Sequence, residues 1–375
     1  MKILMITPFY YPIIGGSETQ IENLAINLNK MGMLTDIVTF NFDEMMRPLP
    51  FKKIERINGL RVIKTPAFDF LPIRHNKINF MVNFIPRKFI QILNEYDVLH
   101  FHNETDLTLP VFSHKIRKPK VFHLRCLNVT YPIFKRNFVC RHLLRKIANV
   151  YIAQSTYVSH LLLDLGIPNN KIEVIPNAID VSIFKSVGEK AKNRLLYVGR
   201  IEDYKGLHVL LKSLRLIRVP VELLIIGPMV GEPNYHRKIM RLITEISEKT
   251  VHKVVYLGPK KSRELLQYYQ SASVVVMPSL SESFGNVILE SLACETPVIA
   301  SSVGGIPEII SSYENGILVP PNNEVKLAEA IQYLLSDEDI RQRLGRCGRK
   351  IVMEKYSLEV VTQKLLGVYK KLLED

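Results

Sequence analysis

The chain has 375 residues, which is too long for one ordinary hydrophobic core and suits two α/β domains. Its hydrophobic content of 47% excludes a disordered chain, and no stretch reaches the roughly 18 uninterrupted apolar residues of a membrane-spanning helix. The net charge of +14 comes from one part of the sequence, because residues 47–146 hold 20 Lys and Arg against 6 Asp and Glu.

Short apolar runs alternate with helical patterns through the first half of the chain. This alternation predicts βαβ units around a parallel sheet. The expected strands are Lys2–Thr7, Thr35–Phe40, Asp97–His102, Lys120–Leu124, Val150–Gln154 and Lys171–Ile175. The runs Ile54–Ile57 and Leu60–Ile63 form a predicted hairpin, since the Asn58-Gly59 pair between them tolerates the positive φ angles of a two-residue turn. The expected helices include Glu18–Met31, Phe80–Asn94 and Tyr157–Leu165.

The pattern breaks around Pro176–Asp180, and a second alternating series follows the irregular stretch Lys185–Lys192. We therefore place a domain boundary after Asp180. The expected strands of the second series are Arg194–Val198, Glu222–Ile226, Val254–Leu257, Val274–Met277, Val298–Ala300 and Gly316–Val319. Its helices include Leu207–Arg215, Arg263–Ser271, Asn286–Cys294 and Glu324–Leu335, and the chain is helical from there to its end. The fold class is α/β with two doubly wound parallel sheets, whose ligands bind beyond the carboxyl ends of the strands.

In each half of the chain, one short motif follows the first strand. Gly15 and Gly16 precede the first helix, where free amides can bind phosphate, although a plain turn with a helix cap explains them about as well. In the second half, Arg200 and Lys205 lie on the loop after strand Arg194–Val198. Two cations there can clamp a diphosphate leaving group, while the alternative is a pair of surface cations beside a turn.

The strongest motif follows strand Val274–Met277 and carries two carboxylates, Glu282 and Glu290. A helix opens near Asn286, so the amides of Phe284, Gly285 and Asn286 face any anion at its start. Carboxylates so placed can accept hydrogen bonds from two polyol units, such as a sugar and a ribose. The alternative is one acid favoured by the helix dipole and one exposed acid.

A pair of histidines marks the strand Asp97–His102. Alternation puts His100 and His102 on one face, with His102 nearer the carboxyl end of the strand. We interpret His102 as a hydrogen-bond donor or proton shuttle and His100 as a buried structural residue. Glu104 and Asp106 follow as a helix cap, and no further ligands for a metal can be assigned from the sequence.

Taken together and in this order, the motifs resemble glycosyltransferase family 4, the retaining GT-B enzymes that use nucleotide-diphosphate sugars. The resemblance covers nearly the whole chain. Further matching segments are Val174–Asp180, Thr296–Ala300 and Gly304–Glu308. The one departure noted is Ala178, where relatives often have glycine.

The resemblance implies two Rossmann-like domains facing across a cleft, residues 1–180 for the acceptor and 181–355 for the donor, with a final helix, 356–375, packing back on the first. The implied catalytic residues are His102, Glu282, Arg200 and Lys205. The implied donor-binding residues are Gly15, Gly16, Arg200, Lys205, Glu282, Phe284, Gly285, Asn286, Val287 and Glu290. Arg200, Lys205 and the two glycines would hold the diphosphate, Glu282 and His102 would lie by the transferred sugar, and Glu290 would bind the ribose.

The resemblance also implies chemistry without a cofactor or a metal. The usual view is front-face substitution, in which the departing diphosphate accepts the proton of the acceptor. We expect a hexose or N-acetylhexosamine to pass from the nucleotide sugar to a lipid-linked sugar, glycolipid or surface polysaccharide. The alternative is a nucleotide-sugar 2-epimerase of the same two-domain architecture, which would not bring the combination of cations and carboxylates described above.

The basic window, residues 47–146, falls in the acceptor half and suggests an anionic partner. Its apolar and basic runs can lay the domain on an anionic membrane surface, or they belong to core-packing helices with solvated outer faces. No nucleic-acid-binding motif accompanies the charge, so we expect no nucleic acid. The four cysteines lie far apart, which argues against a zinc site and fits a reducing compartment. We expect a cytoplasmic protein, with the inner face of the cell membrane as a peripheral site.

Overall fold

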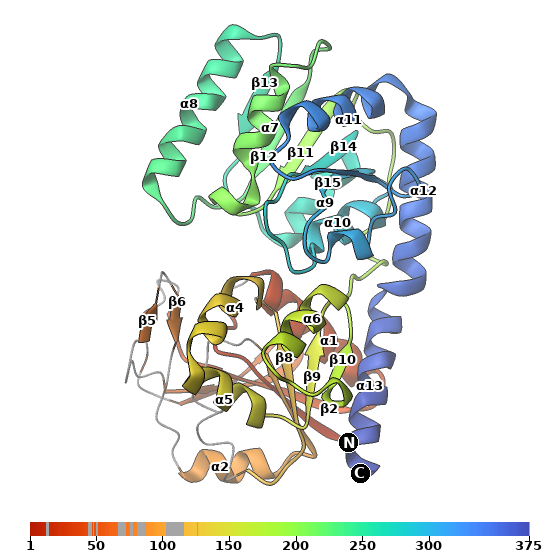
Figure 1. The fold of residues 1–375 in the computed structure, drawn as a ribbon. Helices are drawn as coiled ribbons and strands as arrows, with labels where there is room; N and C mark the ends of the chain where they lie inside the picture. Colours follow the sequence, from red (N-terminus) through yellow and green to blue (C-terminus); the bar gives the residue numbers. More distant parts are fainter. Residues whose placement is uncertain are drawn as a thin grey trace. The chain divides into compact units, whose positions relative to one another are not determined.

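The computed structural model describes residues 1–12, 15–43, 47, 49, 52–66, 73–75, 78–80, 87–102, 116–125 and 127–374. They divide into two compact units, which are described separately below (Figure 1). The first unit contains Met1–Ala178 and Leu358–Asp375, and the second contains Ile179–Ser357. The chain thus enters the second unit after Ala178 and returns to the first at Leu358, close to the boundaries at Asp180 and residue 356 that the sequence suggested.

The first unit is built on an eight-stranded sheet with the order β10-β9-β8-β7-β1-β2-β4-β3. Its strands are β1 (Lys2–Ile6), β2 (Leu34–Phe40), β3 (Lys53–Ile57), β4 (Leu60–Thr65), β7 (Val98–His102), β8 (Lys120–Leu124), β9 (Val150–Ala153) and β10 (Ile172–Val174). All neighbours are parallel except the β3–β4 hairpin. A separate hairpin pairs β5 (Ile73–His75) with β6 (Ile78–Phe80).

Helices cover both faces of this sheet because apolar side chains emerge from both sides of its central strands. The helices are α1 (Gly16–Lys30), α2 (Arg87–Asn94), α4 (Leu127–Arg136), α5 (Phe138–Lys146), α6 (Thr156–Asp164) and α13 (Leu358–Glu374). One hydrophobic cluster joins the sheet to α1 and α13, with Ile21 and Leu365 in its core. The other joins the opposite face to α2, α4, α5 and α6, through residues such as Phe134 and Leu162. The last helix is therefore part of the first unit.

The second unit is a six-stranded parallel sheet with the order β13-β12-β11-β14-β15-β16. Its strands are β11 (Arg194–Val198), β12 (Glu222–Ile226), β13 (Lys253–Tyr256), β14 (Val274–Met277), β15 (Val298–Ser301) and β16 (Ile317–Val319). Its helices are α7 (Leu207–Leu214), α8 (Pro233–Lys249), α9 (Ser262–Ser271), α10 (Asn286–Ala293), α11 (Glu324–Ser336) and α12 (Glu338–Lys355). One cluster packs α7, α8 and α11 on one face, and another packs α9, α10 and α12 on the other.

The α/β fold class with two doubly wound sheets is confirmed, and the predicted strands match the observed ones to within two residues at each end. The predicted helix Phe80–Asn94 is wrong at its start. Phe80 pairs with Ile73 in the β5–β6 hairpin, and the helix runs from Arg87 to Asn94. Residues 81–86 of that prediction lie outside the described part. The proline at position 86 is a helix-start signal that the prediction did not use.

In each sheet, the direction in which the chain adds strands reverses at one point, and the strand order shows where. In the first unit the chain leaves β1 on one side for β2 and later returns on the other side as β7. In the second unit β11 lies in the same way between β12 and β14. Doubly wound sheets bind ligands beyond the carboxyl ends of the strands at such switch points. None of the helices in the described part is both long and apolar enough to cross a membrane.

Candidate functional site

The switch point of the second unit gathers three loops at the carboxyl ends of β11, β14 and β15. The loop after β11 carries Arg200 and Lys205, and the loop after β14 carries Glu282. The two loops are joined where the Leu280 N–H donates to the Tyr204 carbonyl oxygen at 2.7 Å. The third loop, after β15, reaches the second where the Gly305 N–H approaches the Glu282 carbonyl oxygen at 3.4 Å.

Two glycines allow these loops to meet backbone to backbone. Gly206 has a φ of +70°, and a Cβ atom there would lie 1.9 Å from the Pro278 carbonyl oxygen. Gly304 has a φ of +55°, and a Cβ atom there would lie 1.7 Å from the Glu282 carbonyl oxygen. No side chain fits at either distance, so both positions demand glycine. The loop after β14 is therefore held by main-chain contacts at Pro278, from the loop after β11, and at Glu282, from the loop after β15.

Lys205 and Glu282 form an ion pair in this site. The Lys205 Nζ atom lies 2.6 Å from Glu282 Oε2, and the two side chains are 20% and 15% exposed. Arg200 contacts Glu202 through its Nε atom at 3.1 Å and donates to the Tyr204 hydroxyl. The Tyr204 ring also faces the Lys205 ammonium, with 5.4 Å from Nζ to the ring centroid. The fold thus brings the cations Arg200 and Lys205 together with the mostly buried carboxylate of Glu282, and all three are accessible to solvent.

Helix α10 begins directly after this loop. Gly285 caps it with a φ of +109°, and Asn286 is its first residue, followed by Val287. The Phe284 ring is buried and packs edge-on against Tyr356, with 6.0 Å between ring centroids. Phe284 can therefore offer a ligand its backbone amide and not its ring. The helix dipole and the first amides of α10 favour an anion at this end.

Glu290 lies one turn into α10, and its surroundings differ from those of Glu282. Its Oε2 atom accepts a hydrogen bond of 2.5 Å from the Tyr269 hydroxyl. Burial raises the pKa of Glu290 to about 7, and the Tyr269 hydrogen bond opposes that rise. Near neutral pH this carboxyl group exists in both protonation states.

The first unit places its own predicted residues at its switch point. Gly15 caps α1, and Gly16 is the first residue of that helix. Glu18 lies in the first turn, and its carboxylate bends back so far that a Cβ on Gly15 would lie 2.7 Å from its Oε2 atom. Burial raises the pKa of Glu18, while hydrogen bonds from the backbone of Glu18 and Gly15, and the charge of Arg125, act against this. The sequence analysis assigned no role to Glu18, yet its carboxylate covers the helix start where a phosphate was expected.

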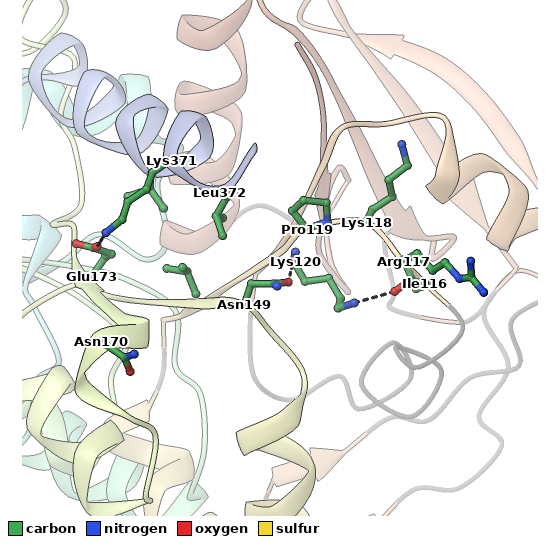
Figure 2. A pocket seen from close by; sticks show the side chains of 12 residues that line it. Ile116, Arg117, Lys118, Pro119, Lys120, Asn149, Asn170, Glu173, Lys371 and Leu372 are labelled. Atoms are coloured by element: carbon green, nitrogen blue, oxygen red, sulfur yellow. Dashed lines mark hydrogen bonds and ion pairs between the residues drawn. The ribbon is translucent and has the colours of Figure 1, made fainter. Parts of the chain in front are cut away.

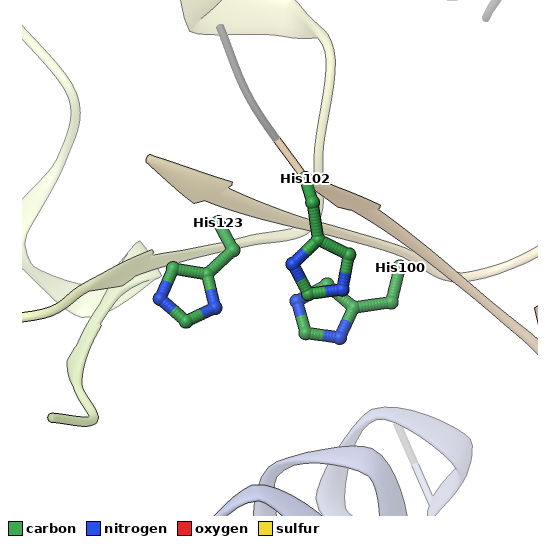
Figure 3. Close-up of side chains that lie close together, drawn as sticks. All are labelled: His100, His102 and His123. Carbon is green, nitrogen blue, oxygen red and sulfur yellow. The ribbon is translucent and has the colours of Figure 1, made fainter. Parts of the chain in front are cut away.

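Three histidines lie together at the carboxyl edge of β7 and β8 (Figure 3). The rings of His100 and His102 are 4.0 Å apart and that of His123 is 5.5 Å from His102, measured between centroids. All three are buried, with exposed fractions of 2% or less. Burial, together with the nearby charge of Arg125, lowers the pKa of each imidazole well below its usual value. All three are therefore neutral at physiological pH.

Arg125 binds two of these histidines. Its Nε and Nη2 atoms lie 3.4 Å from the Nδ1 atoms of His102 and His123, and its Nη1 atom donates to Asn177 at 2.8 Å. One nitrogen of each ring lies within 4.8 Å of a nitrogen of the other two rings, which is a spacing that could hold a metal ion. The Arg125 guanidinium donates to the Nδ1 atoms of His102 and His123. The lone pairs of these two atoms are therefore engaged and not offered to a metal ion.

His100 is bound in a different way from its two neighbours. Its Nδ1 atom lies 2.5 Å from the hydroxyl of Tyr369 on α13. This agrees with its interpretation as a buried structural residue.

Sequence analysis missed Arg125, Asn177 and Gln154, which form one hydrogen-bonded group. Gln154 donates to the Arg125 carbonyl oxygen at 3.0 Å, and Asn177 donates to the Gln154 side chain at 3.3 Å. Arg125 directly follows the predicted strand Lys120–Leu124, and Gln154 ends the predicted strand Val150–Gln154. The rule that singled out His102, a polar residue at the carboxyl end of a buried strand, finds both.

A separate cavity of about 450 Å³ lies at the opposite, amino ends of β8 and β9 (Figure 2). Its lining is basic and holds none of the predicted site residues; it consists of Ile116, Arg117, Lys118, Pro119, Lys120, Asn149, Val150, Asn170, Glu173, Val368, Lys371 and Leu372. The Lys120 ammonium is turned to the Ile116 carbonyl oxygen at 2.8 Å, and Lys371 lies 3.9 Å from Glu173. The four basic groups are partly engaged with their own surroundings and do not converge on one point in Figure 2.

Comparisons with known proteins identify the family of the chain. The family "Glycosyl transferases group 1" matches residues 179–351, and "Glycosyltransferase Family 4" matches residues 14–183. An uncharacterized glycosyltransferase of Methanocaldococcus jannaschii is 30% identical over 100% of this chain and 99% of its own. A D-inositol 3-phosphate glycosyltransferase of Corynebacterium urealyticum is 26% identical over 99% of this chain and 96% of its own.

Solved structures share the fold over the whole chain. The Anabaena protein HepE in complex with UDP and glucose has a TM-score of 0.80 at 20% identity, and 99% of this chain and 100% of that one are covered. Sucrose-phosphate synthase from Thermosynechococcus elongatus has a TM-score of 0.79 at 24% identity, and 100% and 99% of the two chains are covered.

The close approach at Gly206 predicts a large difference between two alanine substitutions. Gly188 has a φ of +69°, nearly that of Gly206, but nothing lies within 4 Å of a Cβ built there. Gly188→Ala should cost about 1 kcal/mol for the left-handed backbone alone. Gly206→Ala should cost about 1–3 kcal/mol more, because the loop after β14 must move. Urea unfolding of both variants measures this, and equal costs would contradict the described loop contact.

Proposed function

Since this chain belongs to the family 4 glycosyltransferases and has their GT-B fold, we propose that it transfers a hexose or N-acetylhexosamine from a nucleotide-diphosphate sugar to a hydroxyl acceptor with retention of anomeric configuration. The observation that carries this proposal is the Lys205–Glu282 pair of 2.6 Å at the switch point of the second unit. A cation for phosphate and a carboxylate for sugar hydroxyls stand side by side there.

The donor diphosphate binds Arg200, Lys205 and the first amides of α10 in this proposal. Both cations are close to solvent and are held by tyrosine and carboxylate partners, so they are pre-oriented before a ligand arrives. Gly15 and Gly16 supply further amides once the Glu18 carboxylate leaves the start of α1. The structures of HepE with UDP and with UDP-glucose support a nucleotide-sugar donor. UDP and its sugars are therefore the first ligands to test.

The nucleoside and the sugar take the two carboxylates. Glu282, fixed by backbone contacts, accepts hydrogen bonds from hydroxyls of the transferred sugar. Glu290 lies deeper on α10 and accepts from the ribose hydroxyls. Phe284, Gly285, Asn286 and Val287 line the sugar and phosphates through their backbone. His102 is a hydrogen-bonding group beside the reacting sugar. Its ring contacts that of His100 and accepts a hydrogen bond from Arg125.

The reaction breaks the bond between the anomeric carbon and the phosphate oxygen and forms one to the acceptor oxygen on the same face. The acceptor proton passes to the departing diphosphate. Arg200 and Lys205 neutralise the charge that grows on this leaving group, which is the task a metal ion performs elsewhere. We therefore propose that the transfer is independent of metals and cofactors, with support from the fixed Arg125 guanidinium among the histidines.

A first prediction concerns the phosphate contact of Lys205. Nucleoside diphosphates and their sugars should raise the melting temperature for one base, and Lys205→Ala should remove most of that shift. Loss of a charge-assisted contact of about 1.5–3 kcal/mol weakens binding roughly 10- to 100-fold. Lys212→Ala is the matched control, because Lys212 on α7 forms a partly exposed ion pair with Glu324 at the start of α11. A shift that survives in Lys205→Ala would contradict the phosphate assignment.

A second prediction follows from the pKa of Glu290, which burial raises to about 7. Ribose hydroxyls donate to the ionised carboxylate, so binding should favour the deprotonated form. Affinity for an intact nucleotide sugar, which has no phosphate group titrating in this range, should rise about tenfold between pH 6 and pH 8. Glu290→Gln should bind with little dependence on pH. Titration calorimetry at both pH values measures this, and a wild-type affinity that falls with pH would contradict the ribose assignment.

The acceptor is proposed to be a lipid-linked sugar, glycolipid or surface polysaccharide, approached at an anionic membrane surface. The support lies on α5, within the basic window 47–146. Phe138 and Val139 in its first turn are 69% and 64% exposed, and the Arg141 guanidinium lies 5.9 Å from the Phe138 ring centroid. Lys135 and Arg136, in the last turn of α4, directly precede this helix. Exposed apolar side chains among cations are typical of interfacial binding. Residues 48, 50–51, 67–72, 76–77, 81–86, 103–115 and 126 of the window lie outside the described part.

This surface predicts binding to anionic vesicles. At low salt the protein should co-sediment with phosphatidylglycerol-containing vesicles and not with phosphatidylcholine vesicles. Replacing Phe138 and Val139 together by serine should reduce the bound fraction several-fold. Val325→Ser is the matched control, since Val325 is 55% exposed in the first turn of α11 in the second unit. Equal binding to neutral and anionic vesicles would refute the membrane proposal.

A further inference from the structure

Arg125 binds two histidines, each at its Nδ1 atom. Its guanidinium reaches Nδ1 of both His102 and His123 at 3.4 Å. We infer that Arg125 is a positioning residue that keeps the proton of His102 on Nε2, so that His102 acts in the reaction as a hydrogen-bond donor and not as a base.

The inference follows from counting donors and lone pairs. A neutral imidazole carries one N–H group and one lone pair, on different ring nitrogens. A guanidinium has only donors and does not lose its proton in proteins. The nitrogen that faces Arg125 must therefore hold the lone pair, and this is Nδ1. The single proton of His102 is left on Nε2, and the same reasoning applies to His123.

The guanidinium cannot turn away from this arrangement at small cost. Its Nη1 atom donates to the Asn177 side chain at 2.8 Å, and Asn177 in turn donates to Gln154. Gln154 also donates to the Arg125 carbonyl oxygen, so the residue is held at both ends. Arg125 is only 6% exposed, and its charge would be costly to bury without these acceptors.

The Nε2 atom of His102 is buried and has no hydrogen-bond partner among the residues that the structure describes. A buried N–H group without an acceptor costs about 1–3 kcal/mol. An oxygen atom of the substrate, either a sugar hydroxyl or a phosphate oxygen, would remove that cost; this step rests on the proposed function. An Nε2–H group has no lone pair with which to take a proton. The acceptor proton must then go elsewhere, and the departing diphosphate supplies the oxygen for it.

His100 provides an internal reference. Its Nδ1 atom is bonded to the Tyr369 hydroxyl at 2.5 Å and not to Arg125. A change at Arg125 should therefore alter the nitrogen signals of His102 and His123 while those of His100 keep their pattern. A general disturbance of the fold would alter all three.

The test is long-range proton–nitrogen NMR of the full chain labelled with ¹⁵N-histidine, with signals assigned by His102→Gln and His123→Gln. In the wild type His102 and His123 should show a protonated Nε2 and an unprotonated Nδ1 from pH 6 to pH 8. In Arg125→Met the His102 signals should shift toward a mixture of tautomers. A wild-type His102 with its proton on Nδ1 would overturn the inference without any variant, and so would an unchanged pattern in folded Arg125→Met.

Kinetics provide a second readout once a donor and an acceptor are in hand. If His102 is a donor, His102→Gln, which keeps an N–H group, should retain at least about tenfold more kcat than His102→Leu. Arg125→Met should lower kcat more than it raises KM for the nucleotide sugar. Equal losses in the two His102 variants would count against the donor role. Absence of sugar transfer in the wild type would contradict the proposed function and leave the NMR result standing.

Discussion

The candidate donor site depends on loops that touch through their main chains. At Gly206 and Gly304 the space for a side chain is taken by the carbonyl groups of Pro278 and Glu282. This contact ties the loops after β11 and β15 to the loop after β14, and it brings Lys205 within 2.6 Å of Glu282. The charged side chains can then meet a ligand without reorganisation, because their backbone is already fixed. In electrostatic catalysis such preorganisation is the main contribution of the protein.

The two units handle charge in opposite ways. In the second unit Arg200 and Lys205 remain near solvent, where they can exchange protein carboxylates for phosphate oxygens. In the first unit three imidazoles are buried and neutral, and two of them accept hydrogen bonds from a single guanidinium. These solvent-accessible cations suit a ligand that arrives and leaves with a negative charge. The buried cluster suits a fixed pattern of donors and acceptors, because burial lowers the pKa of all three imidazoles.

Glu290 and Glu18 show how much the surroundings decide for a carboxylate. Both have a raised pKa because of burial. Glu290 is partnered by the Tyr269 hydroxyl inside the second unit, whereas Glu18 lies over the start of α1 in the first. In the proposed function Glu290 loses its proton when a nucleotide binds, and Glu18 gives up its place to a phosphate.

The sequence alone determined the order of strands and helices, the two doubly wound units and the motifs at the strand ends, because alternation and strand-end polarity are local patterns. It singled out Arg200, Lys205, Glu282 and His102 at or after strand ends, and Glu290 in the helix that follows. Only the tertiary structure decided which atoms meet. Arg125 and His123 are neighbours at the end of β8, but His102 and Asn177 come from distant parts of the chain, and their contacts with Arg125 depend on strand order and register, which no local pattern contains. The tautomer of His102 and the pKa of Glu290 likewise follow from burial and from neighbours, and these exist only when the chain is folded.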